Sequence, residues 1–354
     1  MSCQITVRPS GHQFASENDE TILAAALRAG VSLPYGCKNG ACGNCKGQVL
    51  AGEVEQGPHA AHALSPEEKA AGKALFCCAH AKSDLEIEVR EVAGTREVPV
   101  RKMPARISEI RRIGPDVAVL ALQLPAGERL QYKAGQYLDF ILRDGARRSY
   151  SIATPPHADE QLQFHVRHMP GGRFTDALFG IAKEGQPAFK ERDILRCEGP
   201  LGSFFLREDD ERRPIVLLAS GTGFAPIKAI AEHIFHRGLE QQTPVVLYWG
   251  GRRPADLYEH ETALRWAAEH PGFSYVPVIS NALPDEPWSG RTGFVHAAVM
   301  ADWPDLSGHQ VYACGAPAMV EAAQRDFTTL CGLPEERFFA DAFTSQADLV
   351  DAAP

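Results

Sequence analysis

Three cysteines lie close together in one short loop of the sequence. Cys37, Cys42 and Cys45 have the spacing C-x4-C-x2-C inside the segment YGCKNGACGNC, which also contains three glycines. This spacing, completed by one distant cysteine, is the ligand pattern of a plant-type [2Fe-2S] cluster. The glycines fit the same interpretation, because a chain that folds around four anionic sulfurs needs unusual backbone angles to aim its N–H groups at them.

The fourth ligand must come from the segment LFCCAHAKSDLEIEV, which offers Cys77 and Cys78. Leu85, Ile87 and Val89 alternate with acidic and basic residues, so this segment runs into a half-buried strand, and neighbouring side chains then point in opposite directions. Only one of the two cysteines can face the cluster, and we predict Cys77. The alternative to a cluster is a zinc site. Zinc sites usually show two C-x2-C pairs, whereas this sequence has one pair and an offset third cysteine.

Length and composition restrict the class of protein. The 354 residues exceed one ordinary domain, so two or three are expected. The net charge of −9 argues against a nucleic-acid partner, because phosphate binding needs a concentrated basic surface. Since the chain has neither a signal-peptide core nor an apolar run of about 18 residues, we expect a cytoplasmic protein without a membrane span. A reducing compartment also suits the cluster, because oxidised thiols could not hold iron.

Residues 1–93 are predicted to form a small α+β domain. A hairpin is expected over residues 3–15, a helix over 21–29 with Asp19 as its N-cap, and a closing strand at 84–90. Together with the cysteine loop these elements make a compact unit of ordinary domain size. Residues 94–102 mix Gly, Pro and charged residues without apolar periodicity, so they are predicted to be a linker.

Two different patterns follow the linker. Residues 103–208 contain short alternating strands separated by Gly and Pro turns, which predicts an antiparallel β-barrel. Residues 213–346 alternate apolar strands with amphipathic helices, which predicts an α/β domain with a parallel sheet and a nucleotide at its carboxyl edge. Between them, the segment REDDERR at 207–213 is either a charged linker or a solvated loop. Residues 347–354 are predicted to be a tail.

Two glycine turns stand at strand ends of the third domain. GTGFAP at 221–226 and CGAPAM at 314–319 each lie between a strand and a helix, where backbone N–H groups receive a pyrophosphate. GTGFAP is not G-x-G-x-x-G, and a glycine turn before a helix is often only a turn. Two such edges in one sheet nevertheless predict a dinucleotide cleft. Arg252 and Arg253 follow the second strand, where they could bind a 2′-phosphate, stack on adenine or face solvent; we expect a preference for NADH and leave NADPH open.

The barrel contains two polar motifs. RSYS at 148–151 puts Arg148 and Tyr150 on one face of a strand and two serines on the other; an edge strand with solvent-facing arginines is the alternative. GGRFT at 171–175 is either a plain turn or a helix start at which glycine and Thr175 donate to phosphate.

In order and spacing, RSYS, GGRFT, GTGFAP and YACGAPAM resemble the motifs of the ferredoxin–NADP reductase superfamily. With the N-terminal cysteine loop they resemble, over nearly the whole chain, the reductases that serve multicomponent oxygenases. Within that group the sequence is most similar to CDP-6-deoxy-3,4-glucoseen reductases, the flavin and iron–sulfur partners of a sugar 3-dehydrase. The resemblance implies a β-grasp ferredoxin fold for the first domain, FAD in the barrel and NAD(P)H in the third domain. It also contributes to the choice of Cys77 over Cys78.

The resemblance further implies roles for single residues. Ser151 would hydrogen-bond near flavin N5, and Thr222 and Cys314 would lie beside the nicotinamide. Phe343 would cover the flavin face, although this chain continues beyond it instead of ending on an aromatic residue. The other residues implied to bind FAD are Arg148, Ser149, Tyr150, His165, Val166, Arg167, Gly172, Arg173, Phe174 and Thr175. Those assigned to the nucleotide are Gly221, Gly223, Pro226, Arg252, Gly315, Pro317 and Met319.

Electron counting connects the three cofactors. A nicotinamide gives up two electrons together as hydride, a [2Fe-2S] cluster accepts one at a time, and a flavin can split the pair. We therefore predict an NADH-dependent reductase that delivers single electrons to a partner protein, either a sugar dehydrase or an oxygenase component. Two alternatives are an NAD(P)H:flavin reductase or diaphorase, which would not need the four cysteines, and a non-enzymatic redox-sensing module, which would tolerate a damaged nicotinamide site.

Overall fold

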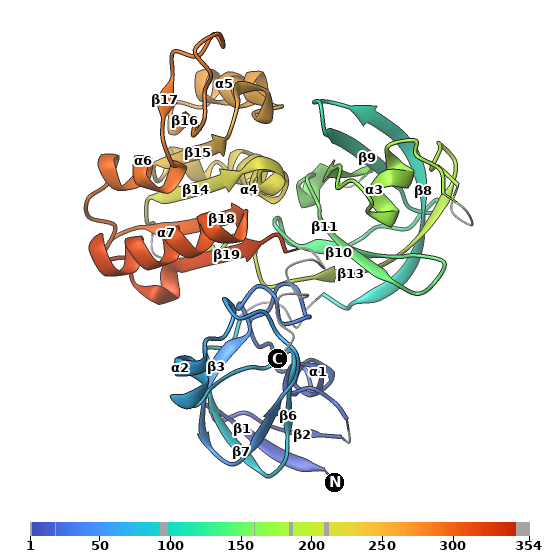
Figure 1. Cartoon of the computed structure of the whole chain (residues 1–354), viewed down its shortest axis with the longest axis vertical. Helices are drawn as coiled ribbons and strands as arrows, with labels where there is room; N and C mark the ends of the chain where they lie inside the picture. Colours follow the sequence, from blue (N-terminus) through green and yellow to red (C-terminus); the bar gives the residue numbers. More distant parts are fainter. Residues whose placement is uncertain are drawn as a thin grey trace. The chain divides into compact units, whose positions relative to one another are not determined.

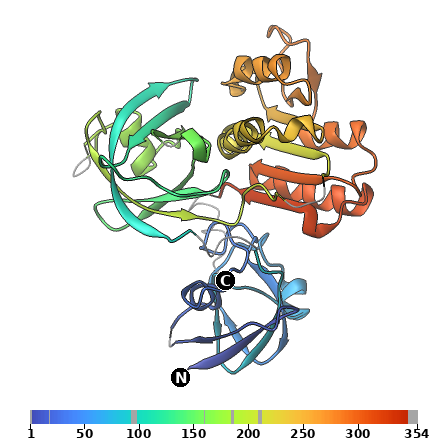
Figure 2. The ribbon, with the colours of Figure 1, turned by 180° about the vertical axis from the view of Figure 1, so that it is seen from behind.

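The computed structural model describes residues 2–17, 19–92, 98–158, 160–183, 187–208 and 212–344. The predicted tail at 347–354, and parts of both predicted linkers, lie outside these ranges. The chain divides into two units. Residues 1–99, 202–204 and 341–354 form the first unit, and residues 100–201 and 205–340 form the second. The N-terminal part of the first unit is blue in Figures 1 and 2.

The first unit is an α+β fold around one mixed sheet with the strand order β2-β1-β7-β3-β5. Ile5 and Val7 on β1 are fully buried and alternate with more exposed neighbours, which is the pattern of a sheet with one face in the core. Helix α1 follows the first hairpin, as predicted. Its N-cap is Thr21 and not Asp19, because the Thr21 hydroxyl accepts a hydrogen bond from the backbone N–H of Ala24 at 3.2 Å. The elements of this unit are β1 (Cys3–Arg8), β2 (Gln13–Ser16), α1 (Ile22–Arg28), β3 (Lys46–Ala51), β4 (Val54–Gln56), α2 (Pro66–Ala70), β5 (Lys73–Leu75), β6 (Ala79–Ala81) and β7 (Leu85–Glu88).

The second unit begins with an antiparallel sheet of order β11-β10-β13-β8-β9-β12. Its two edge strands meet just beyond β11, where the backbone N–H of Ala153 donates to the Gln163 carbonyl at 2.7 Å, so the sheet closes into a barrel (Figure 1). Phe140 and Phe164 are fully buried inside it. The elements are β8 (Arg101–Arg112), β9 (Val117–Gln123), β10 (Tyr137–Ile141), β11 (Arg147–Ser151), η1 (Pro156–Ala158), β12 (Leu162–Arg167), α3 (Arg173–Leu178) and β13 (Ile194–Leu201).

The same unit continues with a six-stranded α/β sheet of order β17-β16-β15-β14-β18-β19. Strands β14 to β16 and β18 run parallel. Because crossovers between parallel strands are right-handed, the reversal of strand order after β16 places α4 and α5 on one face and α6 and α7 on the other (Figures 1 and 2). The main elements are β14 (Ile215–Ser220), η2 (Gly221–Gly223), α4 (Phe224–Arg237), β15 (Val245–Gly251), η4 (Pro254–Asp256), α5 (His260–Glu269), β16 (Phe273–Ile279), β17 (Arg291–Thr292), α6 (Val295–Asp302), β18 (Gln310–Gly315), α7 (Pro317–Leu330) and β19 (Phe338–Ala342), with short η3 (Leu239–Gln241) and η5 (Glu335–Arg337).

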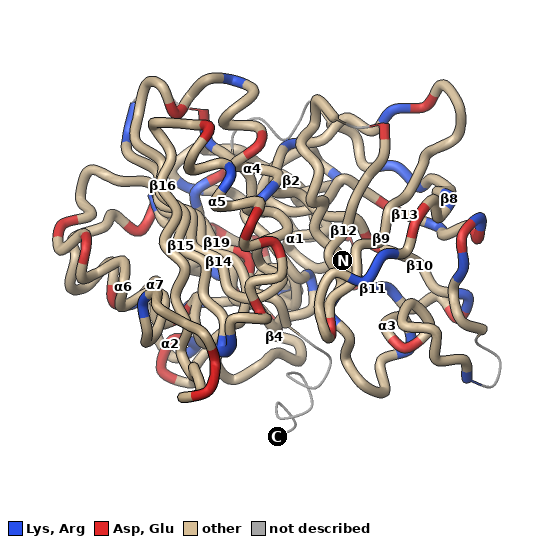
Figure 3. The backbone as a smooth tube through the Cα atoms, turned by 90° about the horizontal axis from the view of Figure 1, so that it is seen from above, with Lys and Arg blue, Asp and Glu red and all other residues tan. Residues whose placement is uncertain are grey.

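These three folds confirm the predicted fold class. Figure 3 shows Lys and Arg interspersed with Asp and Glu along the described chain. None of the helices in the described ranges combines the length and the apolar character that crossing a membrane requires.

Candidate redox sites

The four predicted cluster ligands lie in two pairs. The backbone N–H groups of Cys37 and Cys42 donate to each other's Sγ atoms at 3.3 Å, and the N–H of Cys77 donates to Cys45 Sγ at 3.4 Å. A hydrogen bond from the Cys42 thiol lowers the pKa of Cys37 to about 7, and one from Cys45 lowers that of Cys77 to about 4. Paired sulfurs with N–H groups aimed at them suit a [2Fe-2S] cluster, whose sulfur ligands are anionic thiolates.

Glycine is required at position 40, where the cluster loop packs closely against Cys78. Gly40 has a φ of +79°, and a Cβ there would lie 2.8 Å from Cys78 Sγ and 2.9 Å from the Pro58 carbonyl oxygen. A side chain would therefore push the loop away from its neighbours. Cys78 itself is half-buried, and its Sγ lies 3.5 Å from that of the buried Cys77. The choice of Cys77 as the ligand stays a prediction.

The RSYS motif occupies β11 with the predicted alternation of faces. On one face the Tyr150 ring lies 5.3 Å from the Phe140 ring and 5.0 Å from the Phe174 ring, measured between centroids. On the other face the Ser149 hydroxyl donates to Asp139 Oδ1 at 2.7 Å. Tyr150 therefore caps the aromatic core of the barrel, and its ring is fixed by packing.

The GGRFT motif forms the start of α3, with Gly172 as the N-cap. The buried Thr175 hydroxyl donates to the Met169 carbonyl at 2.9 Å and accepts from the Met169 N–H at 3.2 Å. Arg173 pairs with Asp144. The Thr175 side chain thus shapes the loop that precedes α3, and phosphate binding by this motif stays a prediction.

The two glycine turns of the α/β sheet lie side by side. Strands β14 and β18 are neighbours, with Ala219 opposite Cys314. A Cβ on Gly223 would lie 2.1 Å from the Cys314 carbonyl oxygen, and a Cβ on Gly315 would lie 2.5 Å from the Ser220 carbonyl oxygen. Only glycine permits this approach of backbone to backbone. The turns therefore form one continuous edge, as the prediction of a dinucleotide cleft requires.

The remaining predicted nucleotide residues frame this edge. Half-buried Thr222 lies in η2, and Cys314 at the end of β18 is fully buried. Helix α4 begins at Phe224, so Pro226 lies in its first turn, whereas Pro317 opens α7. The Met319 N–H donates to the Ala316 carbonyl at 3.0 Å in the first turn of α7.

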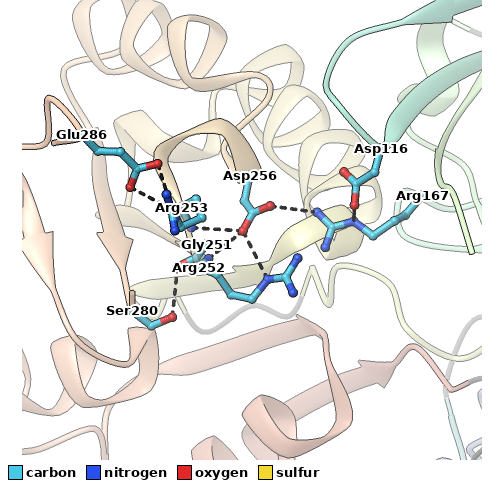
Figure 4. Close-up of polar contacts among 8 residues, drawn as sticks. All are labelled: Asp116, Arg167, Gly251, Arg252, Arg253, Asp256, Ser280 and Glu286. Atoms are coloured by element: carbon cyan, nitrogen blue, oxygen red, sulfur yellow. Dashed lines mark hydrogen bonds and ion pairs between the residues drawn. The ribbon is translucent and has the colours of Figure 1, made fainter. Parts of the chain in front are cut away.

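A carboxylate organises the loop after β15 (Figure 4). Asp256 Oδ2 accepts hydrogen bonds from the backbone N–H groups of Arg252 at 2.8 Å and Arg253 at 3.1 Å. The Arg253 side chain donates to both oxygens of Glu286 at 2.8 and 2.9 Å. The Arg252 side chain is 70% exposed, and its Nε lies 3.6 Å from Asp256 Oδ2. Each arginine thus already faces a carboxylate.

Comparison with known proteins agrees with this arrangement. Three family models match: "2Fe-2S iron-sulfur cluster binding domain" at 5–82, "Oxidoreductase FAD-binding domain" at 104–206 and "Oxidoreductase NAD-binding domain" at 217–325. A CDP-6-deoxy-L-threo-D-glycero-4-hexulose-3-dehydrase reductase of Yersinia pestis is 43% identical over 97% of this chain and 99% of its own length. Reductase component 2 of a terephthalate 1,2-dioxygenase from Comamonas sp is 35% identical over 98% of both chains. The crystal structure of an Amycolatopsis cytochrome P450 reductase matches with a TM-score of 0.76 and 37% identity, covering 97% of this chain and 99% of the other.

The chain belongs to the iron–sulfur flavoprotein reductases of the ferredoxin–NADP reductase superfamily. It is an oxidoreductase whose three domains bind a [2Fe-2S] cluster, FAD and NAD, so the predicted cofactors are confirmed. The assignment of individual residues to these cofactors stays a prediction, including that of Phe343, which follows β19.

In this reductase, two side chains of β12 point towards the α/β domain rather than into the barrel. Val166 belongs to the barrel core, whereas His165 Nδ1 shares a hydrogen bond with the Tyr258 hydroxyl at 3.0 Å. Arg167 Nη2 lies 3.7 Å from Asp256 Oδ1. Burial lowers the pKa of His165 to about 3, so this imidazole is neutral. The contact of these three residues with flavin stays a prediction.

Sequence reasoning missed two residues of this reductase. Tyr258 carried no recognisable motif. Asp341 is buried beside the cluster loop within the first unit: a Cβ on Gly36 would lie 3.1 Å from its Oδ1. Burial and then the Cys37 thiol raise the pKa of Asp341 to about 7. A single acidic residue between two alanines, far along the chain from the cysteine loop, gives no sequence signal for this position.

Proposed function

We propose that the protein takes hydride from NADH, divides the electron pair at FAD and passes single electrons through the [2Fe-2S] cluster to a separate acceptor protein. One observation carries this proposal. The paired cysteines lie on the same chain as the continuous edge formed by Gly223 and Gly315, so the chain combines an entry for a two-electron donor with an exit for single electrons.

The acceptor we favour is a sugar 3-dehydrase. The relatives at 43% and 42% identity are reductases named for a hexulose-3-dehydrase, and they match over nearly the full length of both chains. The acceptor we rank second is a component of a multicomponent oxygenase, because reductases of dioxygenases and monooxygenases match at 34 to 35% identity. We place the reaction in the cytoplasm, since none of the four predicted cluster ligands forms a disulfide and a reducing compartment keeps such cysteines available to bind iron.

The residues of this chain contribute geometry. When bound, the three cofactors supply hydride transfer and one-electron transfer. The N–H groups of Cys37, Cys42 and Cys77 are aimed at sulfur, where they stabilise anionic charge. Gly223 and Gly315 allow the two turns to pack directly against each other, and we assign the backbone N–H groups of this edge to the pyrophosphate. Ser151 ends β11 in a buried position, from which we assign it a hydrogen bond to the flavin.

We propose NADH as the preferred donor. A 2′-phosphate in the β15 loop would have to compete with Glu286 for Arg253 and with Asp256 for Arg252, and the Asp256 and Glu286 carboxylates would repel it. We expect kcat/KM to be higher for NADH than for NADPH. An advantage for NADPH that disappears in Arg252→Ala or Arg253→Ala would contradict this assignment.

Composition and electron transfer test the main proposal. The purified protein should be brown and contain one FAD with two irons and two labile sulfides, and it should reduce the dehydrase component with NADH. A purified protein that contains zinc and no labile sulfide would contradict the assignment of a [2Fe-2S] cluster. NADH oxidation that reduces free flavin but no protein acceptor would favour a flavin reductase or diaphorase. Failure to oxidise NADH with any acceptor would favour a redox-sensing module.

A further inference from the structure

One strand of the flavin barrel carries two polar contacts to the α/β domain within the second unit. His165 and Arg167 alternate on β12 with the core residue Val166, so both point out of the barrel on one face. His165 meets Tyr258, and Arg167 meets Asp256. Tyr258 and Asp256 lie two positions apart in the chain, at and just beyond η4. Two nearby residues of the barrel thus contact two nearby residues of the nucleotide domain.

Tyr258 is joined to the glycine turn through aromatic packing. Its ring stands edge-on to Phe224 at 6.1 Å and to Trp249 at 5.2 Å, measured between centroids. Phe224 and Trp249 stack on each other at 3.9 Å, and Trp249 Nε1 donates to the Gly221 carbonyl at 3.1 Å. A displacement of the Tyr258 ring would therefore disturb the stack that supports the turn.

The groups that act on the Tyr258 hydroxyl include Cys314, which is predicted to lie beside the nicotinamide. Burial raises the pKa of Tyr258 well above its ordinary value, Glu259 and Cys314 raise it further, and Arg167 lowers it. The phenol is therefore neutral, as is His165. The hydrogen bond between these two groups consequently persists across the pH range in which enzymes work, because neither partner ionises there.

The second contact lies at the same turn. The guanidinium of Arg167 lies next to Gly221, since a Cβ on that glycine would lie 3.3 Å from Arg167 Nη1. The Arg167 guanidinium forms ion pairs without hydrogen bonds, with Nε 3.3 Å from Asp116 Oδ2 of the barrel and Nη2 3.7 Å from Asp256 Oδ1 (Figure 4). Because Asp256 also accepts the two N–H groups of the β15 loop, Arg167 links the barrel to the segment that carries Arg252 and Arg253.

We propose that the His165–Tyr258 and Arg167–Asp256 contacts position the nicotinamide edge against the flavin barrel for hydride transfer. This inference rests on the proposed function. Hydride moves only when its donor and acceptor atoms approach to about 3–3.5 Å, and a misplacement of about 1 Å can cost about 100-fold in rate. The two cofactors are held by different folds, so the contacts that join those folds set that distance. His165, Tyr258, Arg167 and Asp256 are positioning residues in this scheme.

The sequence offers a matched pair of variants. Tyr258→Phe removes one hydroxyl and keeps the ring that packs on Phe224. Tyr275→Phe is the control, because the hydroxyl of the half-buried Tyr275 also lies 3.0 Å from a histidine nitrogen, Nδ1 of His260, but both partners belong to the α/β domain. Each substitution therefore removes a hydrogen bond between a tyrosine and a histidine. Tyr258→Phe removes one between the two folds, and Tyr275→Phe removes one within the α/β domain.

The experiment mixes the full-length, cofactor-loaded protein with saturating NADH under anaerobic stopped flow. For Tyr258→Phe we expect the first-order rate of flavin reduction to fall about 10- to 100-fold, the isotope effect with 4-deuterated NADH to increase, and the FAD content to stay at the wild-type level. Tyr275→Phe should reduce flavin at the wild-type rate. Arg167→Met should slow flavin reduction as Tyr258→Phe does. Because the Arg167 side chain is 25% exposed, this variant provides the test if Tyr258→Phe does not fold.

A measurement independent of turnover separates positioning from general stability. Amide hydrogen exchange of the loaded proteins without NADH should be faster in Tyr258→Phe at both 162–167 and 254–258, and unchanged there in Tyr275→Phe. Flavin reduction at the wild-type rate in both Tyr258→Phe and Arg167→Met would overturn the inference while the proposed function stands. Loss of FAD from both variants would also overturn the inference, because it would mean that Tyr258 and Arg167 are needed to bind FAD. A wild-type protein whose flavin NADH does not reduce would instead overturn the proposed function.

Discussion

Two adjacent cysteines have different surroundings, which leads to the first prediction. Cys77 is 7% exposed, and its N–H donates to Cys45 Sγ, whereas Cys78 is half-buried against Gly40. We expect Cys77→Ser to lose the cluster and Cys78→Ser to keep it, because only the Cys77 sulfur lies in a pair with another predicted ligand. Visible absorption and iron content of the two purified variants measure this. Cluster loss in Cys78→Ser alone would assign the ligand to the other cysteine.

The buried imidazole of His165 leads to a prediction about stability and pH. Its pKa is lowered to about 3 by burial and by nearby Lys228 and Arg111, whereas an unfolded histidine has a pKa of about 6.5. Between these values the unfolded chain binds a proton that the folded chain does not, so the free energy of unfolding decreases as pH falls from about 6.5 towards 3, by up to about 1.4 kcal/mol per pH unit.

Denaturant unfolding of the loaded protein checks this effect. His165→Gln removes the titrating group, so its disadvantage relative to the wild type should shrink by about 1 kcal/mol between pH 7.5 and pH 5.5. A disadvantage that is equal at the two pH values would mean that folding does not lower the pKa of His165.

At the scale of elements, the close packing of η2 against the end of β18 determines the shape of the nucleotide edge. Gly223→Ala would place a methyl group 2.1 Å from the Cys314 carbonyl oxygen, so η2 and the end of β18 must separate. We expect FAD and the cluster to be retained but KM for NADH to rise at least about tenfold, since a shift of this size affects substrate placement. Gly308→Ala is the control, because no atom lies within 4 Å of the added methyl group. An unchanged KM for NADH in Gly223→Ala would mean that this edge does not bind the nucleotide.

The same scale explains how much the sequence could predict. The cluster loop, RSYS and the two glycine turns are local patterns, in which the spacing itself places the residues. Tyr258 and His165 are 93 positions apart, and neither has a neighbour that marks it, so their hydrogen bond follows only from the packing of one fold on another. Helix α1 shows a smaller failure of the same kind. Both Asp19 and Thr21 are good N-caps by type, but Asp19 has a positive φ of 61°, which takes it out of the capping geometry.

For the whole molecule, charge on the first unit bears on how an acceptor is recruited. Four acidic residues of the first unit, Glu53, Glu55, Glu67 and Glu68, would steer a basic partner if they were unpaired. However, Glu55 pairs with Lys82, and Glu68 lies 2.7 Å from Lys46 Nζ. Only Glu53 and Glu67 remain exposed without a lysine or arginine partner among the described ion pairs. Salt should therefore weaken electron transfer to a basic acceptor only modestly.

The last prediction concerns the division of labour between the domains. Strand β8 begins at Arg101, which pairs with Gly199 of β13, so a deletion that spares the barrel must end before this strand. A protein lacking residues 1–97 should still oxidise NADH with ferricyanide, which takes electrons from flavin, because the barrel and the nucleotide edge are intact. Reduction of cytochrome c or of the dehydrase should fall at least about tenfold, because the route for single electrons through the cluster is missing.

A full-length Cys45→Ser variant provides the matched control for this deletion. It lacks the cluster but keeps the first unit, so a loss of cytochrome c reduction shared with the deletion assigns the effect to the cluster itself. Loss in the deletion alone would assign it to docking by the first unit. If both proteins reduced the acceptor as fast as the wild type, electrons would leave directly from the flavin, and the paired cysteines would have no part in delivery.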